Sequence, residues 1–207
     1  MNGSRETTSA VPDLSASAWD KRWREKNTGW DLGGVTPALI EWVKAHPVAK
    51  SAVLVPGCGS GYDAHYLAKQ GADTVALDFS PSALAHARSL HPDSRVRWLE
   101  RDVTRLAFDA AFDLVWEYTC FVALHPHQRE AYLAGLARAL RPGGRYLGMV
   151  FQAVPKSDQG PPFQVDPDDF RALLERVFTV ERILVPAPHS IKPRRGSEIW
   201  FEVCRAP

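Results

Sequence analysis

Short apolar runs alternate with amphipathic segments along most of the chain. Seven runs have the length and composition of buried strands, and they lie at residues 52–55, 74–77, 96–99, 113–117, 145–151, 179–184 and 199–203. Helical spacing of apolar residues occurs at residues 37–45, 65–70, 80–90, 128–140 and 167–176. Alternating strands and helices form βαβ units with parallel strands and with helices on both faces of the sheet. The pattern predicts an α/β fold with a seven-stranded, mostly parallel sheet, and the loop between the last two runs predicts an antiparallel strand at its end.

The segment before the first strand has two parts. Residues 1–15 are small and polar, which predicts a flexible arm ahead of a single domain at residues 16–207. Trp19 and Trp23 follow, and their spacing of four places both on one face of a helix. Trp30 lies in a turn-like setting soon afterwards. Taken alone, these tryptophans indicate an amphipathic helix that packs on the core.

Composition narrows the class of partner. The chain carries 25 Lys and Arg against 24 Asp and Glu, whereas nucleic-acid-binding domains have a basic surplus. We therefore expect no nucleic acid, and we interpret the basic run at residues 192–195 as a solvated loop. No apolar run approaches the roughly eighteen residues that span a bilayer, so no membrane contact is expected. Three separated cysteines without metal-ligand spacing favour a reducing cytoplasm, and nothing in the sequence indicates a state other than a monomer.

A glycine-rich turn joins the first predicted strand to the helix after it. The turn reads Gly57-Cys58-Gly59-Ser60-Gly61, and glycines let the chain turn tightly and let a ligand approach the backbone. Asp78 ends the second strand about twenty residues later, where a carboxylate can accept both hydroxyls of a ribose. The turn alone is a weak signal, but together with Asp78 it predicts a cofactor that contains a nucleoside.

NAD and S-adenosylmethionine would both suit this arrangement. The glycine spacing is G-x-G-x-G instead of the dinucleotide fingerprint G-x-G-x-x-G, and the chain has no second domain of the size that a dehydrogenase needs. Asp102 and Val103 follow the third strand, where a carboxylate can accept from the adenine amino group and its neighbour can pack on the ring. Asp102 would equally suit a turn or helix cap. The features together favour methyl transfer over hydride transfer.

With these residues in hand, the chain resembles the thiopurine S-methyltransferase family in the broad sense, which includes plant and bacterial thiol and halide methyltransferases. The matching words are Trp19-Asp20-Lys21-Arg22-Trp23, Gly29-Trp30-Asp31, residues 55–63, Leu77-Asp78-Phe79-Ser80, Glu117-Tyr118-Thr119, Arg141-Pro142-Gly143-Gly144 and Gly160-Pro161-Pro162-Phe163. The N-terminal tryptophans are the specific part, because general methyltransferases share the glycine turn and the aspartate but not that helix.

The resemblance implies a class I S-adenosylmethionine-dependent methyltransferase with a Rossmann-like fold and an N-terminal helical lid. It implies a cofactor site formed by Trp19, Trp23, Trp30, Gly57, Gly59, Asp78, Asp102, Val103 and Tyr118. Aromatic faces attract a sulfonium cation by about 0.5–2 kcal/mol. A helix over the site would also exclude water from the reacting methyl group.

Tyr118 separates the branches of the family. The animal thiopurine enzymes carry a basic residue there, whereas the thiol and halide branch carries a tyrosine; Glu117 replaces that branch's usual aspartate. The expected acceptor is therefore a small soft nucleophile: a thiol, hydrosulfide, thiocyanate or halide. Tyr118 is the catalytic candidate, as a hydrogen-bonding partner of the acceptor or as part of its pocket. Such acceptors need mainly positioning and desolvation, so we expect neither a metal nor a covalent intermediate.

Other functions stay open at this point. An S- or O-methyltransferase for a larger metabolite, such as a thiopurine-like or natural-product acceptor, is the main alternative. A small, closed, apolar pocket under the N-terminal lid and residues 152–163 would favour the soft nucleophile. A non-catalytic cofactor-binding module and a dehydrogenase are the remaining hypotheses, and they predict binding without turnover and binding of a nicotinamide cofactor, respectively.

Overall fold

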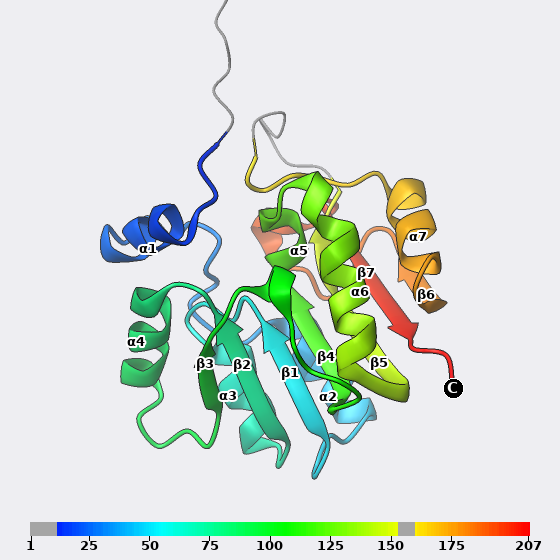
Figure 1. Ribbon diagram of the computed structural model, residues 1–207, viewed down its shortest axis with the longest axis horizontal. Coiled ribbons are helices and arrows are strands. Elements are labelled where there is room, and N and C mark those ends of the chain that lie inside the picture. The colour runs from blue at the N-terminus through cyan, green and yellow to red at the C-terminus, as the bar shows by residue number, and fades with distance from the viewer. Residues whose placement is uncertain (1–11, 153–159) are drawn as a thin grey trace, which may run out of the picture.

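The sheet of the protein has seven strands in the order β3-β2-β1-β4-β5-β7-β6 (Figure 1). The computed structural model describes residues 12–152 and 160–207. The strands are β1 (Ala52–Pro56), β2 (Asp73–Asp78), β3 (Arg97–Glu100), β4 (Phe112–Tyr118), β5 (Leu140–Phe151), β6 (Thr179–Leu184) and β7 (Glu198–Cys204). Strands β1 to β5 are parallel, and β7 is antiparallel to both of its neighbours. The predicted seven-stranded, mostly parallel sheet is confirmed, and the antiparallel strand is the last one of the chain, β7, which lies between β5 and the edge strand β6.

Helices cover both faces of this sheet. They are α1 (Ala16–Arg24), α2 (Pro37–Ala45), α3 (Tyr62–Lys69), α4 (Pro81–Leu90), α5 (Cys120–Ala123), α6 (Arg129–Ala139) and α7 (Pro167–Glu175). Successive strand residues face opposite ways, so Val75 and Leu77 pack with the α6 and α7 side while Ala76 packs with the α2 and α3 side. Two apolar cores therefore sandwich the sheet, which holds the carboxyl ends of the strands in place.

Local sequence signals place the turns that frame the site. Ser80 caps α4 by accepting the backbone N–H of Ala83 at 3.1 Å, and Pro81 occupies the first helical position, where its missing N–H costs nothing. Gly71 follows α3 with a φ of +90°, as helix-ending glycines do. These signals explain why α3 and α4 are found close to their predicted positions.

Two local features differ from the expectations. The four-residue helix α5 has no periodic pattern to predict it, because it is a single turn that starts after Thr119 in the left-handed region at φ +69°. Strand β5 begins at Leu140 and not at Arg145. The pairing shifts between Phe112↔Leu140 and Leu114↔Arg145, so residues 141–144, which the pattern left between a helix and a strand, form an irregularity within the strand. Residues 1–11 of the expected arm and residues 153–159 lie outside the described residues, and the flexible arm stays a prediction.

Candidate active site

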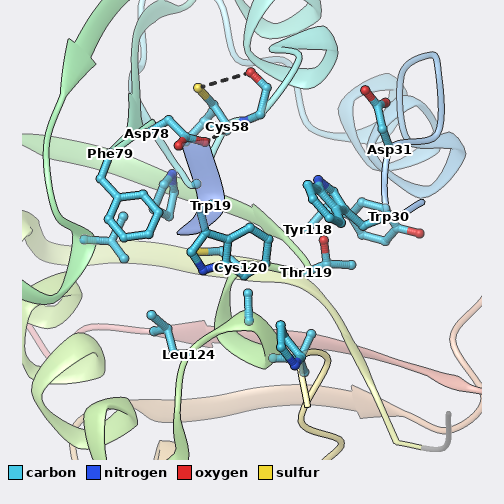
Figure 2. A pocket seen from close by; sticks show the side chains of 18 of the residues that line it. Trp19, Trp30, Asp31, Cys58, Asp78, Phe79, Tyr118, Thr119, Cys120 and Leu124 are labelled. Atoms are coloured by element: carbon cyan, nitrogen blue, oxygen red, sulfur yellow. Dashed lines mark hydrogen bonds between the residues drawn. The ribbon is translucent and has the colours of Figure 1, made fainter. Parts of the chain in front are cut away.

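A cavity of about 610 Å³ opens at the carboxyl ends of the parallel strands. Its wall contains residues that follow β1, β2, β3, β4 and β5, together with the tryptophans of the N-terminal segment. The strand order reverses between β1 and β4, which is the position where open α/β sheets bind ligands. Figure 2 shows Asp78 and Cys58 grouped on one side of the cavity and Trp30 with Asp31 on another.

The glycine turn after β1 has no room for a side chain at two of its positions. Gly57 and Gly59 have φ angles of +60° and +51°, a region that strains other residues. A Cβ at Gly57 would lie 2.7 Å from Sγ of Cys120, and one at Gly59 would lie 3.2 Å from a ring carbon of Trp23. Both glycines line the cavity, so the bare backbone of this turn faces the space that a ligand would fill.

Asp78 has the burial and geometry of a ribose acceptor. Its side chain is only 7% exposed, and its two oxygens accept the backbone N–H groups of Gly59 and Ser80, each at 3.0 Å. Burial raises the pKa of this carboxyl, and the hydrogen bonds from Ser80 and Gly59 oppose the rise. A carboxylate offers about four lone-pair positions, which is more than these backbone bonds use, so Asp78 can also accept from a ribose hydroxyl. The residues present therefore fit a nucleoside.

Asp102 combines the two roles that the sequence left open. Its Oδ1 accepts the backbone N–H and the hydroxyl of Thr104 at 2.8 and 2.7 Å, which caps the short 3-10 helix η1 (Val103–Arg105). Asp102 and Val103 both line the cavity, beyond Asp78 along the sheet. Oδ2 of Asp102 lies 3.8 Å from Nε of Arg105 in an exposed ion pair, which is too long for a hydrogen bond and leaves this oxygen able to accept from a ligand.

The three N-terminal tryptophans form one cluster at the rim of the cavity. Trp30 packs edge-on against Trp19 and Trp23, with ring centroids 5.1 and 6.0 Å apart. All three line the cavity, and none of the α1 residues is fully buried. The helix therefore forms a lid, as the family resemblance implies, and the interpretation of a helix packed on the core is wrong.

Asp20 fixes this lid to the sheet domain, and sequence reasoning gave it no role. Its Oδ1 accepts the hydroxyl of Ser80 and the backbone N–H of Ser82, both at 2.9 Å. The N–H of Ser82 is the main reason that the pKa of Asp20 is lowered. The bond joins the lid to the start of α4, directly beside Asp78. No local pattern marks a partner that lies so far along the chain.

Tyr118 lies in the cavity wall with its hydroxyl fully engaged. The phenol donates to Oε1 of Glu198 at 2.7 Å and accepts from Nη1 of Arg194 at 2.5 Å. Nη2 of Arg194 donates to the backbone carbonyl of Trp30 at 2.8 Å. The interpretation of residues 192–195 as a solvated loop is therefore wrong for Arg194, which ties the lid to the end of β4. Neither Arg194 nor Glu198 was predicted as a site residue.

The two halves of the cavity differ in charge. The half formed after β1, β2 and β3, with the lid, is rich in ionisable side chains: Arg22, Asp31, Asp63, Asp78, Glu100, Arg101 and Asp102. The half formed after β4 and β5 contains Tyr118, Thr119, Cys120, Val122, Ala123, Leu124, Gln128, Phe151, Pro161 and Pro162. Within the described part of this second half, only Tyr118 and Cys120 ionise, and burial raises the pKa of both. The wall of the first half therefore carries an excess of acidic groups, and the wall of the second half is largely apolar.

Residues 12–152 and 160–207 contain neither a metal-binding cluster nor a membrane-spanning helix. Within these ranges, no three His, Cys, Asp or Glu side chains are grouped in a way that would hold a metal ion. In the same part of the chain, no helix has the length and apolar character needed to cross a bilayer.

The comparison with known families agrees with this geometry. The family model described as thiopurine S-methyltransferase matches residues 14–195, from the lid to the segment that carries Arg194. The chain belongs to the thiopurine S-methyltransferase family. Thiocyanate methyltransferase 1 from Arabidopsis thaliana is 32% identical over 191 residues, which cover 89% of this chain and 83% of that protein. Thiopurine S-methyltransferase from Aliivibrio fischeri (strain MJ11) is 27% identical and covers 88% and 96%.

Solved structures show the same fold for this member of the thiopurine S-methyltransferase family. The 1,6-didemethyltoxoflavin-N1-methyltransferase of Burkholderia thailandensis, solved with S-adenosylhomocysteine, has a TM-score of 0.76 at 22% identity, over 94% of this chain and 88% of that one. The protein is an S-adenosylmethionine-dependent methyltransferase with a Rossmann-like class I fold. When bound, S-adenosylmethionine supplies an electrophilic methyl group on a sulfonium.

Proposed function

We propose that this methyltransferase transfers the methyl group to a small soft nucleophile: a thiol, hydrosulfide, thiocyanate or halide. One observation carries the proposal. The described wall after β4 and β5 is largely apolar, and its two ionisable side chains, Tyr118 and Cys120, both have raised pKa values because they are buried. This half is therefore suited to an acceptor that needs neither a base nor strong hydrogen bonds.

The same half favours weakly hydrated anions on energetic grounds. Moving an anion from water into an apolar site costs desolvation, and the cost is smallest for large, polarisable ions. Halides and thiocyanate carry no proton that must be removed, and a thiol would enter as its thiolate. The protein then contributes position and exclusion of water, which are the terms that accelerate an in-line displacement.

We place the cofactor along the charged half of the cavity. Asp78 would hold the ribose, Asp102 and Val103 the adenine, and Gly57 with Gly59 the close approach of the backbone. Trp19, Trp23, Trp30 and Tyr118 would surround the sulfonium end. The support for this placement is the excess of carboxylates in that half, since the cofactor carries a positive charge, and the position of the aromatic lid beside it.

The relatives support the same class of acceptor. Their names include thiocyanate methyltransferase 1 and probable thiol methyltransferase 2, at 32% and 30% identity. We also propose a cytoplasmic monomer that acts on a small molecule: the balanced charge argues against nucleic acid as the partner, and the free cysteines favour a reducing compartment.

Turnover of S-adenosylmethionine to S-adenosylhomocysteine tests the proposal. The acceptor panel would contain iodide, bromide, thiocyanate, hydrosulfide, an aromatic thiol, a thiopurine and a phenol. We expect turnover with the soft anions and thiols and little with the phenol. If S-adenosylmethionine binds but only the thiopurine or none of the panel is methylated, the acceptor is a larger metabolite and the proposal is wrong.

A further inference from the structure

A buried carboxylate lies directly behind the apolar half of the cavity. Glu117 is fully buried, and its Oε1 accepts the backbone N–H of Phe121 at 2.6 Å. Its Oε2 accepts the hydroxyls of Tyr132 and Tyr146, each at 2.6 Å. Both oxygens are therefore used inside the protein, and none of the three bonds reaches the cavity. The bond to Phe121 holds the first turn of α5, the helix that lines the apolar half.

Arg129 holds the other part of this wall. Its Nη2 donates to the backbone carbonyl of Phe163 at 2.6 Å, and its guanidinium lies 4.7 Å from the ring centre of Phe121. The N–H of Phe163 donates to the carbonyl of Val122 in α5 at 2.7 Å. The segment that presents Pro161 and Pro162 to the cavity is thereby tied to α5.

The charges of the two residues support each other although both are buried. Arg129 is 8% exposed, and its burial lowers the pKa of the guanidinium to about 10, while Glu117 opposes the change. Burial raises the pKa of Glu117, and the tyrosine hydroxyls, the Phe121 N–H and Arg129 oppose that rise. The hydrogen bonds of Glu117 and of Arg129 Nη2 connect α5 with the segment at Phe163, and buried polar groups that are held in this way favour one arrangement of the wall, although Nε of Arg129 has no hydrogen-bond partner within the described residues.

We propose that Glu117 and Arg129 are positioning residues that fix the apolar wall of the cavity and thereby set how the enzyme discriminates between acceptors. The inference rests on the proposed function in one respect, namely that the acceptor enters the half after β4 and β5. The reach of Glu117 is the essential property. A side chain one methylene shorter, anchored at the same place, cannot meet the Phe121 N–H and both tyrosine hydroxyls together.

Two substitutions at Glu117 distinguish the effect of side-chain length from the effect of the negative charge. Glu117→Asp keeps the negative charge but is too short to make all three hydrogen bonds. Glu117→Gln keeps the reach, because its carbonyl can accept from Phe121 while its amide donates to the tyrosine hydroxyls, which also act as acceptors. In the full chain we expect Glu117→Asp to change the ratio of kcat/KM for iodide to kcat/KM for an aromatic thiol by about tenfold. We expect Glu117→Gln to keep that ratio within about threefold.

Hydrogen exchange gives a second readout that needs no acceptor. With S-adenosylhomocysteine bound, Glu117→Asp is expected to speed exchange at residues 120–123 by about tenfold while β1 stays protected. Arg129→Met is expected to do the same at the amides of Phe163 and Gln164, because Pro161 and Pro162 carry no N–H. Leu174→Ala, a fully buried residue of α7, is the matched control: it lowers stability through a cavity but should leave both the acceptor ratio and the local exchange unchanged.

The outcomes separate this inference from the proposed function. If wild-type enzyme methylates none of the soft nucleophiles, the proposed function fails, and the exchange experiment still decides the role of Glu117. Wild-type exchange at α5 in Glu117→Asp would overturn the positioning role. An equal shift in Glu117→Gln and Glu117→Asp, or in Leu174→Ala, would also overturn it, since charge or general stability would then explain the effect.

Discussion

The hydroxyl of Tyr118 donates its only proton to Glu198, with the two oxygens 2.7 Å apart. Glu198 is 1% exposed and lies at the start of β7, paired with Phe151 at the end of β5. Arg194 donates to the same hydroxyl and stacks over both the Tyr118 and Phe151 rings, at 5.4 and 5.2 Å. These contacts fix the ring of Tyr118 in the wall of the cavity. Its proton is committed to a partner inside the protein, and burial raises its pKa further from neutral.

Tyr118→Phe should consequently be a mild change. The ring stays, so we expect kcat/KM to fall by no more than about tenfold and the pH profile to keep its shape. Glu198 and Arg194 lose a partner, which should lower stability by about 1–3 kcal/mol in thermal or denaturant unfolding. Tyr118→Ala removes the ring as well, and a loss of about a hundredfold is expected. Loss of turnover in Tyr118→Phe with a changed pH profile would show instead that the hydroxyl handles a proton.

Trp19 offers a test of cation recognition by the lid. The two cofactor forms differ in charge, because only S-adenosylmethionine carries the sulfonium. We expect Trp19→Ala to weaken S-adenosylmethionine binding by about 2–30-fold more than S-adenosylhomocysteine binding, while Trp19→Phe keeps most of the preference. Isothermal titration of both ligands measures this difference. Trp42→Ala, on α2 outside the cavity wall, is the control. Equal losses for both ligands would mean that Trp19 contributes packing alone.

Much of the fold and about half of the site could be predicted, because the signals that define them come from residues that are close together in the sequence. The alternation of strands and helices depends on neighbouring residues, and the glycine turn and Asp78 each sit at a strand end that the pattern defines. The sheet order then brings Gly57, Asp78 and Asp102 together, because the carboxyl ends of parallel strands share one edge. The resemblance to the family added the lid tryptophans, whose periodicity alone indicated a core helix.

The remaining part of the site depends on distant contacts. Arg194 meets the carbonyl of Trp30 across 164 residues, and Glu198 meets Tyr118 across 80. A basic run in a loop carries no signal that distinguishes a fully solvated segment from one in which a single arginine, Arg194, is partly buried and hydrogen-bonded. The same is true of Asp20, whose partners Ser80 and Ser82 lie at the start of α4. Only the assembled sheet supplies these pairings.

Asp78 predicts how cofactor binding depends on pH. Because burial raises its pKa, Asp78 takes up a proton at a higher pH than an ordinary aspartate and then loses acceptor capacity for the ribose. The Kd for S-adenosylhomocysteine should therefore rise as the pH falls, and the rise should begin at a higher pH than an ordinary aspartate would cause. The folded state holds this proton more tightly than the unfolded chain does, so protonation of Asp78 stabilises the folded state. Weaker binding of S-adenosylhomocysteine at low pH would therefore not arise from Asp78 unfolding the protein.

Asp78→Asn is the comparison for that experiment. It should bind S-adenosylhomocysteine about tenfold or more weakly at neutral pH, and its Kd should vary less with pH than that of the wild type. Thermal unfolding over the same range checks that both proteins stay folded. A wild-type Kd that is flat with pH, or an equal slope in Asp78→Asn, would place the titrating group elsewhere.

Because the described wall of the apolar half of the cavity provides no base, the pH dependence of kcat/KM should follow the ionisation of the acceptor itself. Iodide and thiocyanate are anions throughout the usual pH range, so kcat/KM for them should be nearly flat. For cysteine, whose thiol has a pKa of about 8.5, kcat/KM should rise with the thiolate fraction and level off near that pKa. A more acidic aromatic thiol should level off at correspondingly lower pH, because the described residues of this half provide no free base. Thiocyanate, measured at each pH, reports the stability of the enzyme itself. If both thiols level off at one common pH, a group of the protein removes the proton, and the acceptor does not have to arrive as an anion.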